Sequence, residues 1–462
     1  MRRFAAYRGA VSTRTDQTWT ESTSSTGVRH LRKANLEALR NRARQLDRDN
    51  VLASGILDRA VDNIVGSGMN VQARTTDKGF NDAVEEKWKD WSEKCDVRGL
   101  SSFADLQRLL LRAYFRDGDV GINLLPDGRL QAIEGDLIES PQGSQETKIV
   151  DGVEVNRVGR PVRFHVKSAV RAGEQRHTAI AAQDFVYLPR MKRLNQTRGE
   201  PVFAPVMPLF DQIDGLVDGT VIAARMAANF GLLIHESPKE RAALPKVTDS
   251  QGTNRPQLDM EPGMIKWLGE ADTVTQVKPE QPTQSFPDFI ATLLRFTGLN
   301  LGLPLELIFL DFSRTNYSSA RAALLQSQRS FNAIQNWFIS RAMSRLYNWR
   351  VQKWINDGEL NAPDGRTSDG RPIAWEHEFI APGWQWVDPV KEAQAIGLSL
   401  DLGLTTIADE LSKVGSRDFE NVLDKRRREI DAMRTAGMDQ VHSTMTRDAT
   451  NAATARKNDA DS

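Results

Sequence analysis

The sequence predicts an α+β fold divided into several domains, and three observations support this prediction. The chain has 462 residues, which at about 150 residues per domain suggests roughly three domain-sized units. Residues 31–205 alternate helical and strand-like patterns, as a mixed domain does. Apolar spacing of three or four then dominates residues 209–230 and 286–354, on either side of a polar, proline-rich excursion at 236–284.

Within the first of these regions, each element is indicated by its own pattern. A hairpin is predicted by two strand-like runs, VGINLL and RLQAIE, on either side of the turn Pro126-Asp127-Gly128. Helical spacing from Leu36 to Val65 stops at Gly66-Ser67-Gly68, a typical helix end. The other elements expected here are helices over 81–95 and 102–116 and strands over 70–74, 153–158, 161–167 and 184–188. Outside this region, short strands are expected around 264–268 and over the alternating run AWEHEF at 374–379.

The most informative segment is Leu301–Ala320, an irregular polar-tipped stretch between two helical patterns. Downstream of it, apolar or small residues recur every three or four positions over about eight helical turns. They are Ala320, Leu324, Ser327, Phe331, Ile334, Phe338, Ala342, Leu346 and Trp349. Two interpretations stay open at this point. The pattern indicates either a helical hairpin in an ordinary core, or a rod that projects a polar loop to the axis of a ring.

Composition narrows the class of protein. The 61 basic and 61 acidic side chains cancel, so no global field draws the chain to nucleic acid or to a membrane, although residues 1–50 hold eleven Lys/Arg against five Asp/Glu. The single cysteine, Cys95, excludes an internal disulfide and is read as a buried structural thiol in a reducing cytoplasm. No stretch approaches the ~20 apolar residues of a membrane span, so a soluble protein is expected.

Motifs of enzyme chemistry are missing from the sequence. It contains no G-x-x-x-x-G-K-[ST] loop, and the six histidines lack zinc-site spacing. Asp117-Gly118-Asp119 departs from a calcium loop and is read as a turn before the hairpin. Two basic runs, 189–199 and 425–428, could touch nucleic acid, but a solvated loop and a solvated helix face are the preferred interpretations.

Four blocks of sequence resemble the portal proteins of tailed bacteriophages of the lambda type. They follow an early Tyr7 and Trp19 and together span roughly residues 7–350, whereas the last hundred residues match only in general character. The blocks are NRARQLDRDNVLASGILDRAVDNIVGSGMNVQ, FRDGDVGINLLPDGRLQAIEGDLIESP, LPRMKRLNQTRGEPVFAPVMPLFDQIDGLVDGTVIAARMAANFGLLI and LGLPLELIFLDFSRTNYSSARAALLQSQRSF.

The resemblance implies a portal-type subunit with a mixed α/β wing, an α-helical stem, a small α/β clip, a long tunnel-loop helix and a helical crown. The implied boundaries are a disordered N-terminal tail 1–30, wing 31–208, stem helix 209–235, clip 236–285, second stem helix 286–302, tunnel loop 303–318, long helix and wing return 319–388, crown helices 389–436 and disordered C-terminal tail 437–462.

The resemblance also implies a function without enzymatic activity, cofactor, metal or membrane. Copies would form a homo-oligomeric ring, expected to be a dodecamer, at one capsid vertex of the virion after assembly in the host cytoplasm. The ring would pass double-stranded DNA non-specifically during packaging and ejection. It would dock the terminase large subunit and the head-completion or adaptor proteins, contact the major capsid and scaffolding proteins, and nucleate procapsid assembly.

Site residues are implied in two places. The tunnel-loop residues expected to face DNA are Asp311, Ser313, Arg314, Thr315, Asn316 and Tyr317, and the clip residues expected to contact partners are Lys266, Trp267 and Glu270. A neutral chain suits such a bore, because every phosphate held by Lys or Arg would slow the passing genome.

Two other classes of function remain as alternatives. One is a nucleic-acid-processing phage protein such as a nuclease or a packaging-motor component, against which the missing phosphate loop and carboxylate cluster argue. The other is a different capsid or connector protein, which would have no reason to carry the helix–loop–helix at 286–354.

Overall fold

The structure, a computed structural model, describes residues 33–141, 143, 149–171, 174–229, 233–235, 246–248, 254–256, 273–275, 286–313, 315–384, 389–415 and 419–436. The chain divides into two compact units. The first unit contains the chain up to Val202, the short piece Leu301–Leu303 and everything from Phe312 onward. The second contains Phe203–Asn300 and Pro304–Asp311.

The helices of the first unit begin where polar residues cap them. The side chains of Asn50, Asp77 and Ser102 each accept a hydrogen bond from the backbone N–H three residues later, which starts α2, α3 and α4. One continuous helical pattern was expected through residue 65, but the cap at Asn50 divides it into α1 and α2. The helices are α1 (Lys33–Asp49), α2 (Val51–Ile64), α3 (Lys78–Ser92), α4 (Phe103–Asp117), α8 (Tyr317–Phe338), α9 (Ser344–Asn356), α10 (Pro389–Asp401), α11 (Ile407–Gly415) and α12 (Phe419–Thr435).

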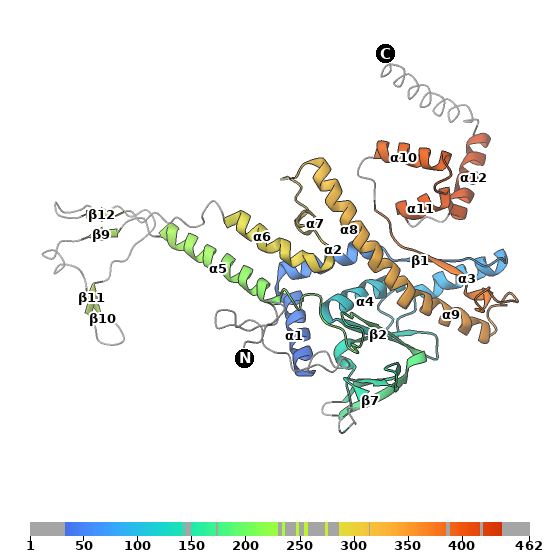
Figure 1. Ribbon diagram of the computed structural model, residues 1–462, viewed down its shortest axis with the longest axis horizontal. Helices are drawn as coiled ribbons and strands as arrows, with labels where there is room; N and C mark the ends of the chain where they lie inside the picture. Colours follow the sequence, from blue (N-terminus) through green and yellow to red (C-terminus); the bar gives the residue numbers. More distant parts are fainter. Residues whose placement is uncertain are drawn as a thin grey trace, which may run out of the picture. The chain divides into compact units, whose positions relative to one another are not determined.

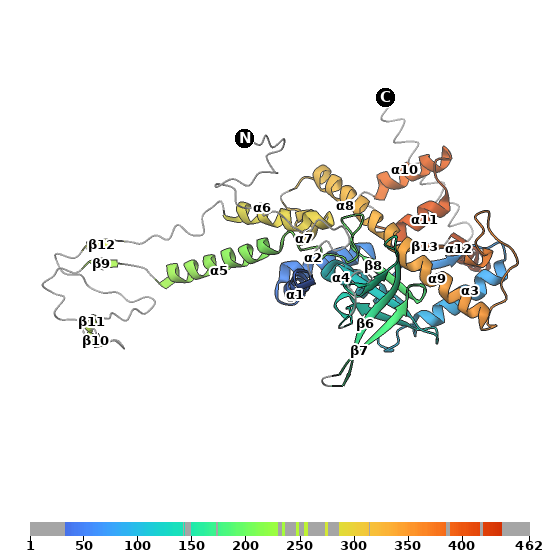
Figure 2. The ribbon, with the colours of Figure 1, turned by 60° about the horizontal axis from the view of Figure 1, so that its bottom comes forward.

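The strands of the first unit form small antiparallel sheets. The predicted hairpin is confirmed as β2 and β3, and β8 completes a sheet of order β3-β2-β8. A second sheet has the order β4-β5-β6-β7 and forms the long ribbon visible in Figure 2. Its strand β7 was not predicted. The strands are β2 (Asp119–Leu124), β3 (Leu130–Glu134), β4 (Ile149–Val150), β5 (Val153–Val155), β6 (Pro161–Arg171), β7 (Glu174–Ala181) and β8 (Phe185–Pro189).

A third pairing joins distant parts of the chain. Strand β1 (Asn70–Ala73) pairs with β13 (His377–Ile380) in antiparallel register, so that Asn70 faces Ile380. Both strands were expected, but their pairing was not. Short 3₁₀ turns, η2 (Gly135–Leu137), η3 (Ala182–Asp184) and η7 (Ile373–Trp375), connect the strands and helices.

Two apolar clusters form much of the core of the first unit. One packs the two larger sheets together through Ile133, Ile138, Val153, Phe164, Val166 and Phe185. The other is aromatic and is centred on Trp88, whose ring lies 4.7 Å from Trp91, 5.4 Å from Phe103 and 5.5 Å from Tyr347. The second cluster ties α3 and α4 to α9, and it contributes both apolar burial and ring–ring contacts.

The predicted rod is present as α8 and α9, joined without a break by a π-helical turn, η6 (Ile339–Met343). Its predicted stripe faces inward, because Phe331, Phe338, Ala342 and Leu346 are all buried. Figure 1 shows α8 and α9 as one continuous orange element. The π-turn, which the apolar spacing did not reveal, adds a residue to one turn of the rod.

The second unit is built on α5 (Met207–Asn229) and α6 (Phe286–Gly298), which pack side by side (Figure 1). The 3₁₀ turn η5 (Leu299–Leu301) follows α6, and α7 (Leu305–Phe309) packs against α6. The predicted strand at 264–268 lies outside the described residues. Short antiparallel pairs join β9 (Leu233–His235) to β12 (Thr273–Thr275) and β10 (Lys246–Thr248) to β11 (Asn254–Pro256).

Several smaller expectations can be checked directly. Cys95 is buried, and burial raises the pKa of its thiol to about 12, which fits a structural role. Lys425–Arg428 are exposed on α12, as a solvated helix face requires. In the described part of the chain, no helix has both the length and the apolar character needed to cross a membrane.

Candidate channel segment and a buried arginine network

The candidate functional segment, Leu301–Ala320, alternates between the two units. Its α7 lies in the second unit, follows Pro304 and ends at Phe309, and the next residue, Leu310, has a positive φ of 53°. The stretch from Phe312 onward belongs to the first unit. There the Asn316 side chain accepts a hydrogen bond of 2.8 Å from the Ser319 backbone N–H and so starts α8.

Both apolar and polar side chains are exposed at the tip of this segment. Phe309, Leu310 and Phe312 are exposed to 44%, 54% and 39%, values that are high for large apolar residues. Asp311 and Ser313 are exposed beside them. Leaving these apolar side chains in water costs free energy in the isolated subunit.

Four of the residues predicted to face DNA are described, and they lie in this exposed stretch. Asp311, Ser313 and Asn316 are exposed, whereas Thr315 is half-buried and bonded through its N–H and hydroxyl to the Phe312 carbonyl at 3.2 Å. Arg314 and the side chain of Tyr317 lie outside the described residues, as do the three predicted clip contacts, Lys266, Trp267 and Glu270.

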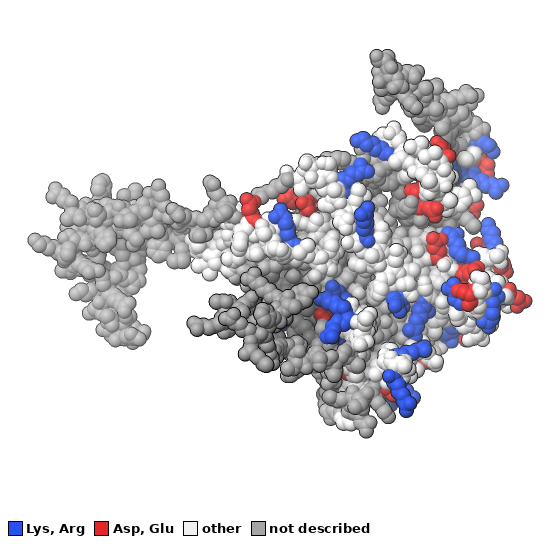
Figure 3. Space-filling view, in the orientation of Figure 1, with Lys and Arg blue, Asp and Glu red and all other residues white. Residues whose placement is uncertain are grey.

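The arrangement of side chains in the described ranges also decides whether a metal ion could be held there. Within the described ranges, no group of three or more His, Cys, Asp or Glu side chains is placed to hold a metal ion. Figure 3 shows Lys/Arg and Asp/Glu side chains interspersed on one face of the molecule, without a continuous basic stripe.

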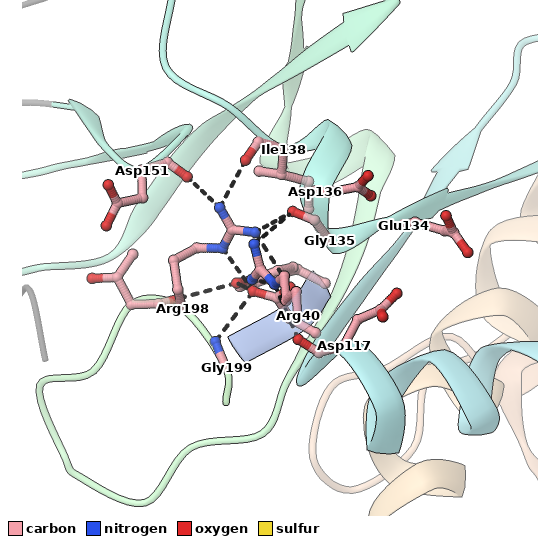
Figure 4. A network of polar contacts seen from close by, with 12 residues as sticks. Arg40, Asp117, Glu134, Gly135, Asp136, Ile138, Asp151, Arg198 and Gly199 are labelled. Atoms are coloured by element: carbon pink, nitrogen blue, oxygen red, sulfur yellow. Dashed lines mark hydrogen bonds and ion pairs between the residues drawn. The ribbon is translucent and has the colours of Figure 1, made fainter. Parts of the chain in front are cut away.

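A buried ionic network, which sequence reasoning missed, organises the first unit. Asp119 is fully buried at the start of β2, and each of its oxygens meets an arginine. Arg40 of α1 donates from Nη2 to Oδ1 at 2.7 Å, and Arg198 donates from Nε to Oδ2 at 2.6 Å. The Tyr187 hydroxyl and the Gly199 backbone N–H also donate to Oδ2. Figure 4 shows the two guanidinium groups converging from different elements.

The remaining donors of the two arginines are satisfied by backbone carbonyls. Arg198 bonds to the carbonyls of Gly135 and Ile138, and Arg40 bonds to those of Asp117 and Gly135. Burial alone would raise the pKa of Asp119, but Arg198 and Arg40 outweigh burial and hold this pKa below its ordinary value. The network therefore clamps α1, β2 and the 190–199 loop together as a charged but fully bonded centre.

This network corrects one expectation from the sequence. The run 189–199 was read as a solvated loop, and Lys192 and Arg193 are indeed exposed. Arg198, however, is only 7% exposed and reaches inward to Asp119. One signal in the sequence could have indicated this network. Asp119 is the first residue of a strand with apolar neighbours, and a buried carboxylate there would be costly without a basic partner.

A second layer of charges covers this centre at the surface. Asp117 accepts from Arg44 and from Arg116, at 2.9 Å in each case to its Oδ2. Arg44 also bonds to Asp136, and Arg116 to Glu134. Asp117 is fully buried, whereas Glu134 and Asp136 are exposed, so the pairs of Glu134 and Asp136 contribute less than the buried ones.

Comparison with known proteins places the chain in a family. A model described as "Phage portal protein, lambda family" matches residues 12–335, about two thirds of the chain. The chain belongs to the lambda family of phage portal proteins. The matched range contains the Asp119 network and the segment Leu301–Ala320.

This portal chain is similar to curated relatives over nearly its whole length. It is 22% identical to a probable portal protein of Halomonas phage phiHAP-1, covering 94% of this chain and 87% of the relative. It is 21% identical to portal protein B of Escherichia phage lambda, covering 95% and 92%. Among solved structures, it resembles a chain from the neck of an empty gene transfer agent particle, with a TM-score of 0.48, 13% identity and coverage of 80% and 92%.

Proposed function

We propose that copies of this chain assemble into a closed ring, expected to have twelve subunits, at one capsid vertex. The bore of the ring passes double-stranded DNA during packaging and ejection, and the chain has no enzymatic activity of its own. The family match over residues 12–335 carries this proposal. A closed ring also agrees with the cyclic symmetry that most homo-oligomers adopt.

Exposed apolar side chains in the second unit support assembly. On α5, Leu216, Val217, Val221 and Ile222 are exposed to between 37% and 55%. On α6, Phe289 and Phe296 are half exposed. A lone subunit would leave this surface in water at a cost of roughly 25 cal/mol per Å², so a neighbouring copy that covers it stabilises the ring.

Within this ring, we propose that the tip of the Leu301–Ala320 segment forms the narrowest part of the bore. Its described side chains offer exposed apolar and small polar groups, and the chain as a whole carries no net charge. Contacts of this kind are weak and blind to sequence, as the passage of a whole genome requires, because counterion release at many basic groups would slow it.

We further propose that the chain docks the terminase large subunit and the head-completion or adaptor proteins at residues 236–285. Lys266, Trp267 and Glu270 are the proposed contacts. We also propose contacts with the major capsid and scaffolding proteins during procapsid assembly in the host cytoplasm. These partners come from the family resemblance, and pull-down with purified terminase large subunit tests the first of them.

Class averages of the purified full-length protein in negative stain, together with native mass spectrometry, test the ring. We expect rings with a central hole and a mass of twelve chains of 51.7 kDa. Only monomers or small compact particles would contradict the proposal. Divalent-metal-dependent DNA cleavage or ATP turnover by the same preparation would favour the alternative function, a nuclease or motor component.

A further inference from the structure

A cavity of about 830 Å³ opens beside the π-helical turn in the first unit, and nothing above assigns it a role. We call it the aromatic–arginine pocket. It is lined by Tyr114, Arg160, Pro161, Phe164, Ala182, Gln183, Phe185, Tyr187, Pro189, Met191, Trp337, Arg341 and Arg345.

Aromatic rings supply much of the pocket's apolar lining. Tyr114 of α4 lies 4.5 Å from Trp337 of the long helix, between ring centroids. On the sheet side, Tyr187 lies 5.0 Å from Phe164, which stacks on Phe185 at 4.5 Å. Phe164 and Phe185 are core rings, so the partly exposed rings of Tyr114, Tyr187 and Trp337 are the ones that a ligand can contact. A further aromatic side chain that entered this cavity would gain apolar burial and ring–ring contacts.

Arginines supply all the formal charge of the lining. Arg160 and Arg341 are exposed, and their side chains make no hydrogen bond or ion pair in the described part of the chain. Arg345 donates from Nη2 to the carbonyls of Ala182 and Gln183, at 2.6 and 2.9 Å, and has Asp184 nearby. No described lining residue carries a carboxylate. The pocket therefore has an excess of positive charge that an anionic ligand would complement.

The π-turn lies between residues of the long helix that line the pocket. Trp337, Arg341 and Arg345 follow one another at steps of four along the long helix, and η6 (Ile339–Met343) lies among them. The same turn packs against β8. Single π-turns within α-helices often occur at functional sites, because the extra residue re-aims the side chains around it.

One segment of this chain has the complementary chemistry. Residues 1–32 carry six arginines, but the stretch Asp16–Glu21 has none of them and holds both carboxylates of the segment, one on each side of its only tryptophan, Trp19. The span from Trp19 to Lys33, the first described residue, is fourteen residues (33 − 19), or about 46–50 Å of extended chain. That reach is comparable with the width of a compact domain.

We propose that the aromatic–arginine pocket binds the segment Asp16–Glu21 of this chain. Trp19 occupies the aromatic lining, and the two carboxylates pair with Arg160 and Arg341. Duplex DNA is a poorer occupant, because its bases are stacked inside the helix and cannot enter a cavity. The proposal does not rest on ring formation, since binding can be scored in any oligomer.

Photo-crosslinking in the full-length protein tests this proposal. The photoreactive residue p-benzoylphenylalanine replaces Trp19, and the crosslinked positions are mapped by mass spectrometry after irradiation. We expect crosslinks to pocket residues, above all to Met191, whose side chain is a favoured partner of the excited benzophenone. The double variant Arg160→Glu/Arg341→Glu should lower the yield of these crosslinks by about tenfold, as loss of two ion pairs predicts.

Two controls make the result specific. Arg329→Glu reverses an exposed charge on α8 that does not line the pocket, and it should leave the yield unchanged. Adding Asp16→Arg/Glu21→Arg to the Arg160→Glu/Arg341→Glu chain should restore the crosslinks by exchanging the charges. Crosslinks that map away from the pocket, or a yield that does not respond to Arg160→Glu/Arg341→Glu in a folded chain, would overturn the proposal.

Discussion

At the scale of single residues, Asp119 is the carboxylate on which the buried ionic network depends. It is fully buried and compensates two buried guanidinium groups that lie 79 positions away in either direction along the chain. Removing one member of such a centre is costly, because the desolvated charges that remain lose their partner. The clamp is therefore more sensitive to substitution than any of the surface pairs around it.

We predict that Asp119→Asn lowers the free energy of unfolding of the first unit by about 3–5 kcal/mol. The amide keeps the shape of the side chain but leaves Arg40 and Arg198 facing each other without a negative charge. Chemical denaturation followed by circular dichroism measures the loss. Asp127→Asn is the matched control, because Asp127 pairs with Arg129 at the surface. The unfolding midpoint of the Asp127→Asn variant should equal that of the unchanged chain.

The same residue predicts a pH dependence. The pKa of Asp119 is lower in the folded state than in the unfolded state, so its contribution is complete above the ordinary aspartate pKa. That contribution is lost as the pH falls from there through the folded-state pKa. Unfolding midpoints measured from pH 6 to pH 2 should fall less steeply in Asp119→Asn than in the unchanged chain. Parallel curves would mean that Asp119 does not ionise in the folded protein.

At the scale of elements, the junction between α4 and β2 depends on a close approach of two glycines. Gly118 ends α4 with a φ of 89°, and a Cβ placed there would lie 2.3 Å from the backbone of Glu200. A Cβ on Gly199 would lie 1.8 Å from the Gly118 carbonyl oxygen. This contact brings the 190–199 loop, and Arg198 with it, to the buried end of β2.

We predict opposite effects for two glycine-to-alanine substitutions in the first unit. Gly118→Ala should destabilise by about 1–3 kcal/mol through backbone strain alone, with the clash adding to it. Gly55→Ala should stabilise by about 0.5–1 kcal/mol, because Gly55 lies inside α2 with open space where its Cβ would point. Thermal unfolding of both variants checks the signs, and a stable Gly118→Ala chain would contradict the close approach.

Helix α5 gives a second prediction at this scale. Val217→Glu/Val221→Glu places two charges on its exposed apolar face and should prevent ring formation while the subunit stays folded. Val158→Glu is the control, since Val158 is 85% exposed in a turn of the first unit and should not affect assembly. Native mass spectrometry reads out both. Intact rings in the double variant would place the subunit contacts elsewhere.

At the scale of the whole molecule, the relevant property is the balance between acidic and basic side chains. Equal numbers of acidic and basic side chains suit a ring that conducts DNA without holding it. In the proposed bore, the exposed tip around Asp311 and Ser313 would add small polar and apolar contacts to this neutral background. A change of charge at the tip would be repeated in every subunit, which multiplies its effect in the assembled bore.

We predict that Arg314→Glu lowers the yield of DNA-filled particles by roughly tenfold or more and leaves ring assembly intact. The added carboxylates, one from each subunit, would repel the phosphate backbone at the proposed constriction. Complementation of a portal-deficient phage, with particles counted by electron microscopy, measures the yield. Arg314→Lys keeps the charge and should package normally. Folded subunits that fail to form rings would instead assign Arg314 to a subunit interface.

Local patterns in the sequence determined most of the helices, the β2–β3 hairpin and the inward stripe of the long rod. Periodicity, caps such as Ser102 and turn residues such as Gly128 act within a few positions, so each can be read from neighbouring residues. The sequence also carried the four blocks that identify the family, and with them the expectation that Leu301–Ala320 is functional.

Only the tertiary structure decided the pairing of β1 with β13, the Asp119 clamp, the π-turn and the aromatic–arginine pocket. Apart from the π-turn, which is local but leaves the apolar spacing unchanged, each joins groups that are far apart in the chain, such as the 79 residues between Arg40 and Asp119 or about 300 between the paired strands. No local pattern predicts such contacts. They form because buried charges and the backbone groups of strand edges are costly unless they are paired, and the partner can lie anywhere in the chain. Arg198, which reads as part of a solvated loop in isolation, therefore lies in the buried network around Asp119.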